Sequence, residues 1–161
     1  MKQEIKLGLK KGLLFLVIIN LFVLVFSAFF TINRTASLPT GIYFLYSYSE
    51  LKKGDIVVFL PVEAAKDYLP KNTKYMMKEI QGMEGDEIKI VNNVLYINDE
   101  NFGKVFETDI TGKKLPRTDI KEIPKGEVFL VTRAEGSFDS RYWGTLKEDK
   151  IHKKAKLIIQ F

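Results

Sequence analysis

An uninterrupted apolar run near the N-terminus constrains most strongly what this chain can fold into. Residues 13–30 read LLFLVIINLFVLVFSAFF, with Asn20 and Ser27 as the polar positions and no charged side chain. A helix over this run is about 27 Å long, close to the hydrocarbon thickness of a bilayer. We therefore expect a transmembrane anchor over residues 13–31.

A cleaved signal peptide is the alternative interpretation of this segment. Signal peptides have a shorter apolar core, of about 7–15 residues, followed by a small-x-small cleavage site. Here the run is longer, and bulky residues (Phe29, Phe30 and Ile32) stand where a cleavage site would follow. The sequence favours an uncleaved anchor; a secreted soluble binding protein would require removal of this run.

Basic residues are distributed unevenly around the run. Arg34 stands just after it, whereas the lysines before it are Lys2, Lys6, Lys10 and Lys11. The positive-inside rule then predicts a single-pass protein of the plasma (inner) membrane, with residues 1–12 in the cytoplasm. Residues 32–161 form the extracytoplasmic domain in this prediction.

The composition narrows the chemistry open to that domain. The chain has no cysteine and one histidine, so thiolate metal sites, disulfides and thiol nucleophiles are excluded, and we expect no metal and no other cofactor. The net charge of +5 is modest, and we expect no nucleic-acid binding. We interpret the basic cluster at 152–156 as a solvated edge strand, with attraction to anionic lipid headgroups as an alternative.

After the apolar run, short strand-like segments are separated by turns. This pattern predicts a mainly β fold, a compact all-β domain such as a small barrel or sandwich. Asn92-Asn93 predicts a tight hairpin, because both asparagines can adopt positive φ. Residues 63–68 are expected as a short helix or an ordered loop, and 102–124 as irregular excursions. The expected strands are 41–48, 56–60, 74–81, 88–91, 94–97, 127–131 and 157–161.

Two side chains stand out as candidates for chemistry. The strand period of two places Lys78 on the same face as Met76 and Ile80, so burial would lower the pKa of its amine and allow it to activate a serine. A snorkelling edge lysine is the alternative. Ser37 lies in a short segment that Pro39 makes rigid, although a plain juxtamembrane linker would also contain serine. His152 lies among exposed basic residues, so we do not expect a Ser-His-Asp triad.

Three segments follow the apolar run in order. Residues 37–43 read Ser-Leu-Pro-Thr-Gly-Ile-Tyr, and in residues 78–86 a lysine stands four residues before a Gly-x-x-Gly-Asp turn. Residues 139–144 read Asp-Ser-Arg-Tyr-Trp-Gly. Together these segments resemble the type I signal peptidase family, a family of serine–lysine peptidases, and more closely its conjugal-transfer and pilin maturation branch.

The resemblance implies a role for each matching residue. Ser37 would be the nucleophile and Lys78 its general base, and Thr35 would join the Ser37 amide as an oxyanion donor. Ser137 would orient the lysine amine, and Asp139 with Arg141 would form a supporting ion pair. The chain departs from the family pattern at Glu84, where a proline is usual, and in the short stretch between Asp86 and Glu127.

The implied function is that of a membrane-bound serine endopeptidase, a hydrolase that cleaves signal or leader peptides from exported precursors. Its partners would be a membrane-tethered precursor protein and the lipid bilayer. We prefer a dedicated enzyme for a conjugation or pilus-type precursor over a housekeeping signal peptidase. The alternative from another class is a non-catalytic bitopic scaffold with an exported β-domain.

Overall fold

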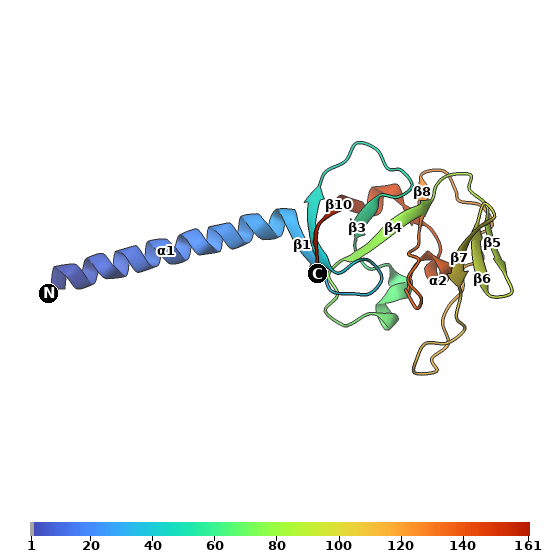
Figure 1. Cartoon of the computed structure of the whole chain (residues 1–161), viewed down its shortest axis with the longest axis horizontal. Coiled ribbons are helices and arrows are strands. Elements are labelled where there is room, and N and C mark those ends of the chain that lie inside the picture. Colours follow the sequence, from blue (N-terminus) through green and yellow to red (C-terminus); the bar gives the residue numbers. More distant parts are fainter. Residues whose placement is uncertain (1) are drawn as a thin grey trace.

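A computed structural model describes residues 2–161 and separates a long helix from a β-rich domain (Figure 1). The helix, α1 (Lys2–Phe29), projects from the domain as a rod. Its segment Lys6–Phe29 is long and apolar enough to cross a membrane. The helix ends at Phe29 because β1 (Phe30–Asn33) begins at the next residue and pairs with the domain.

A seven-stranded sheet forms the larger part of the domain, and its strands follow the order β1-β2-β10-β3-β4-β8-β9. All of its pairings are antiparallel. The strands besides β1 are β2 (Gly41–Tyr46), β3 (Ile56–Phe59), β4 (Met76–Gly82), β8 (Glu127–Leu130), β9 (Leu146–Lys147) and β10 (Ile151–Gln160). Because β1 opens this sheet, the last turn of α1 lies directly against it.

A second, three-stranded sheet consists of β5 (Ile88–Val91), β6 (Val94–Ile97) and β7 (Glu100–Lys104). Asn92 and Asn93 have φ of 49° and 59°, which confirms the predicted hairpin turn. The β7 strand falls partly in the region expected to be irregular. Short helices complete the fold: η1 (Glu63–Tyr68), α2 (Ser140–Trp143) and η2 (Glu148–Lys150). The predicted mainly β fold is thus confirmed.

The prediction for the basic cluster at 152–156 is wrong. This segment belongs to β10, which pairs with β2 on one side and β3 on the other, so it lies inside the sheet. Lys154 is buried, and its amine lies 2.7 Å from the carboxylate of Asp55. The ion pair with a residue far away in sequence explains how a lysine-rich segment occupies an interior strand.

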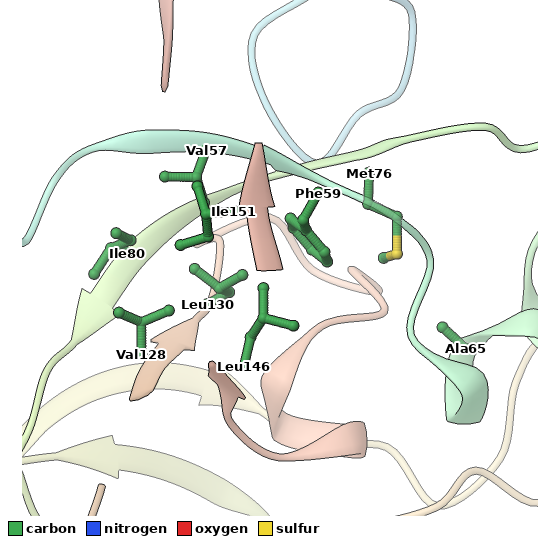
Figure 2. Packing of buried hydrophobic residues seen from close by; sticks show 9 residues of the cluster. All are labelled: Val57, Phe59, Ala65, Met76, Ile80, Val128, Leu130, Leu146 and Ile151. Atoms are coloured by element: carbon green, nitrogen blue, oxygen red, sulfur yellow. The ribbon is translucent and has the colours of Figure 1, made fainter. Parts of the chain in front are cut away.

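The main core lies between the seven-stranded sheet and the elements that cover it (Figure 2). Gly82, the last residue of β4, packs against a second core cluster, because a Cβ there would meet Phe129 at 3.1 Å, with Ile123 closer still. The close packing fixes the path of β4, which carries the candidate lysine. The core residues drawn in Figure 2 are Val57, Phe59, Ala65, Met76, Ile80, Val128, Leu130, Leu146 and Ile151.

Candidate active site

A cleft of about 1440 Å³ runs from the last turn of α1 to the loop after β8. Four of the six predicted site residues line it: Thr35, Ser37, Lys78 and Ser137. The other two, Asp139 and Arg141, lie behind the wall that carries Ser137 and are fully buried. The fold therefore brings three segments that are distant in sequence to one place.

The loop between β1 and β2 holds Ser37, and the buried side chain of Asn33 organises it. The Asn33 amide donates hydrogen bonds to the carbonyls of Thr35 and Leu38 at 2.9 Å and of Pro39 at 3.2 Å. Its Oδ1 accepts from the Thr35 backbone N–H. One side chain thus satisfies the backbone of a loop that has no sheet partner, which fixes the position of Ser37.

The hydroxyl of Ser37 is half-buried and lies 3.1 Å from the Thr35 hydroxyl. The Thr35 hydroxyl also donates to Asn33 Oδ1 at 2.8 Å. Its single proton is therefore directed at Asn33, and the Ser37 proton points to Thr35. To act as an oxyanion donor, Thr35 would exchange Asn33 Oδ1 for the oxyanion.

Lys78 is 6% exposed, on the face of β4 that also buries Met76 and Ile80. Its Nζ donates to Ser137 Oγ at 2.8 Å. Burial lowers the pKa of the Lys78 amine to about 8, with the charge of Asp139 opposing the shift and that of Arg141 adding to it. A pKa near 8 leaves about a tenth of the amine neutral at pH 7, enough to supply a base.

The wall behind Ser137 is built around the Asp139–Arg141 pair. The carboxylate accepts from Arg141 Nε at 2.7 Å and from a terminal guanidinium nitrogen at 3.1 Å. Arg141 also donates to the carbonyls of Lys104 at 2.9 Å and Thr132 at 2.7 Å. Buried and fully hydrogen-bonded, the pair ties α2 to the ends of β7 and β8 and holds the loop of Ser137 against Lys78.

Sequence reasoning missed Asn33 as a member of the site. A signal was present, because asparagine side chains often hydrogen-bond the backbone two residues on, and Asn33 stands two residues before Thr35. Tyr43 and Ile80 are fully buried in the core and do not line the cleft. Met76 does line the cleft, with Leu45 and Val58.

The turn that follows β4 supports the strand that carries Lys78. Gly85 has a φ of +82°, which favours glycine, and Asp86 accepts a hydrogen bond from the Met83 N–H at 2.7 Å. Lys53 pairs with the same Asp86 carboxylate at 2.7 Å. The Gly-x-x-Gly-Asp segment thus shapes a turn and stays clear of the cleft.

Comparison with known proteins gives concordant matches. A family model described as signal peptidase, peptidase S26, matches residues 7–160. The plasmid transfer protein TraF of Escherichia coli is 28% identical over 137 residues, which cover 74% of this chain and 77% of that protein. Signal peptidase IB of Staphylococcus aureus is 32% identical over 122 residues, covering 66% of this chain and 59% of the relative.

A solved structure was also matched. The crystal structure of a signal peptidase I from Enterococcus faecalis V583 gives a TM-score of 0.44 at 21% identity, covering 67% of this chain and 98% of that one. The chain matches 53% of the length of a signal peptidase I from Leptolyngbya laminosa.

Proposed function

Since the chain belongs to the signal peptidase, peptidase S26, family, we propose that it is a membrane-bound serine endopeptidase that cleaves signal or leader peptides from exported precursors. Ser37 is the nucleophile and Lys78 is the general base in this proposal. The observation that carries it is the buried amine of Lys78, which lines one cleft with Ser37 and whose pKa burial lowers to about 8.

The proposed reaction proceeds through an acyl-enzyme. Ser37 Oγ attacks the scissile carbonyl carbon while neutral Lys78 takes the hydroxyl proton. The Lys78 ammonium returns that proton to the leaving amine as the C–N bond breaks, which leaves an ester on Ser37. Water then attacks the ester while Lys78 accepts a water proton. Lys78 returns that proton to Ser37 Oγ as the C–O bond of the ester breaks, which restores both groups and releases the acid product.

Two donors would stabilise the oxyanion, the Ser37 backbone N–H and the Thr35 hydroxyl. A well-placed donor of this kind lowers the barrier by about 3 kcal/mol. Ser137 would act as a positioning residue, because its hydroxyl is the hydrogen-bond partner of Lys78. Asp139 and Arg141 support that hydroxyl from behind and touch no reacting atom.

The finer assignment is a single-pass protein of the plasma membrane with its domain outside the cytoplasm, dedicated to a conjugation or pilus-type precursor. The similarity to TraF, which extends over 77% of that protein, supports the dedicated substrate. The uneven lysines and the candidate span at Lys6–Phe29 support the topology. Cleavage then follows small residues at the −1 and −3 positions, as the family resemblance implies.

The test is cleavage of a panel of membrane-tethered precursors by the wild-type protein and three variants. Ser37→Ala and Lys78→Ala should each lower the cleavage rate at least about a thousandfold. Lys74→Ala removes an exposed lysine that precedes the same strand and should cleave like the wild type. Equal activity in all four proteins would contradict the assignment of Ser37 and Lys78.

A further inference from the structure

The cleft is not confined to the β domain. Beyond Ser37 and Lys78 it is lined by Ser27 and Ala28 from the last turn of α1, and by Thr31 from β1. Ser27 and Ala28 have small side chains, so little side-chain volume closes this end of the cleft. If α1 spans the membrane, as proposed above, this end of the cleft lies at the bilayer surface.

The helix end is fixed to the domain at this place. The last turn of α1 contains no basic residue, yet Lys153 of β10 donates from Nζ to the Ala28 carbonyl at 3.3 Å. The same amine lies 5.6 Å from the centre of the Phe29 ring. A lysine here satisfies a terminal carbonyl and complements the negative end of the helix dipole.

Aromatic side chains continue this attachment on the opposite side of the helix. The rings of Phe26 and Phe30 lie 4.7 Å apart, and Phe30 lies 5.4 Å from Phe44 of β2. An α-helix turns by 100° per residue, so Phe22 lies on the same aromatic face of α1, well away from Ser27 and Ala28. One face of α1 therefore binds the domain, and another opens into the cleft.

We propose that the last turn of α1 is part of the substrate site: Ser27 and Ala28 contact the apolar segment of a membrane-held precursor, and Lys153 positions that turn. The inference rests on the proposed function. A precursor whose scissile bond reaches Ser37 must run back along the cleft and enter the bilayer beside α1. Its apolar segment is then the occupant that fits this end of the cleft.

Cross-linking tests the contact without requiring catalysis. The chain has no native cysteine, so Ala28→Cys in a Ser37→Ala background gives one thiol beside the cleft. The probe is a membrane-held precursor that the wild-type protein cleaves, with one cysteine introduced into its apolar segment, in vesicles. We expect a disulfide yield at least about fivefold higher from Ala28→Cys than from the matched Phe22→Cys. Equal yields, or a higher yield from Phe22→Cys, would overturn the proposal.

A second measurement tests Lys153 as a positioning residue. Lys153→Gln should lower cleavage of the membrane-held precursor about fivefold more than cleavage of a soluble peptide that spans the same site. Lys153→Arg should restore the ratio, and the exposed Lys156→Gln on the same strand should not change it. Peptide cleavage by the wild type reports on the proposed function, and the ratio reports on this inference. If Lys153→Gln leaves the ratio of precursor cleavage to peptide cleavage unchanged, the inference is wrong.

Discussion

At the scale of single residues, the burial of Lys78 controls the pH dependence of the proposed reaction. The base must be neutral, and burial lowers the pKa of this amine to about 8. We expect kcat/KM to increase about tenfold per pH unit below that value and to level off above it. Cleavage rates between about pH 6 and pH 10 check this prediction. A flat profile, or a maximum on the acidic side, would disagree with it.

The same burial predicts a cost in stability. Between the folded and unfolded pKa values of Lys78 the unfolded chain binds more protons, so wild-type stability increases as the pH rises above about 8. Below that pH the full cost of the buried ammonium is present. Lys78→Met keeps a similar unbranched shape and should raise the free energy of unfolding at pH 7 by about 2 kcal/mol.

Denaturant unfolding of the full chain in detergent micelles measures this effect. The gain from Lys78→Met should shrink steadily as the pH is raised from about 8 toward the range where lysine is neutral in water. Lys74→Met, at an exposed position, serves as the control and should show no such trend. A destabilised Lys78→Met at pH 7 would mean that the ammonium is well accommodated.

At the scale of elements, the loop between β1 and β2 depends on Asn33. Asn33→Ala removes three donated hydrogen bonds and takes away the partner of the buried Leu38 carbonyl. We expect the rate of precursor cleavage to fall about tenfold to a hundredfold, because a displaced nucleophile reacts slowly. Steady-state kinetics check this, with the exposed Asn101→Ala as the control. Wild-type kinetics from a folded Asn33→Ala would show that the loop holds its shape without this side chain.

The elements also show what local sequence can and cannot predict. The strand period predicted correctly that Met76, Lys78 and Ile80 share a buried face of β4, because a strand covered on one face repeats every two residues. β10 lies inside the sheet because it pairs with β2 and β3, and Lys154 there forms an ion pair with Asp55. These contacts join residues far apart in sequence, and no local pattern reports them. The four-residue α2 is too short to show a helical period.

The residues of the candidate site likewise fall into those that local sequence predicts and those that it does not. Ser37, Lys78 and the box at 139–144 could be predicted because each lies in a segment that resembles a known family. Asn33 acts through five atoms of its own loop, so its importance follows from the loop conformation that it creates. The contribution of Ala28 and Lys153 depends on how the helix meets the sheet, and neither residue belongs to a recognisable motif.

At the scale of the whole molecule, the proposal requires the β domain and the start of α1 to lie on opposite sides of the membrane. Because the chain lacks cysteine, one thiol at a time can report on this. Ile110→Cys, on a fully exposed loop, should react with a membrane-impermeant maleimide added to intact cells or spheroplasts. Gln3→Cys, which precedes the candidate span Lys6–Phe29, should react only after the membrane is permeabilised. The opposite pattern would reverse the proposed topology.

The proposed enzyme depends most on a Lys78 amine that can lose its proton near neutral pH, and a direct titration of that amine tests it without any substrate. The measurement is ¹⁵N NMR of the full chain with labelled lysine in micelles, with the Lys78 signal assigned by its loss in Lys78→Arg. The account predicts a midpoint near pH 8 for that signal. A midpoint at the ordinary lysine value of about 10.4 would contradict it.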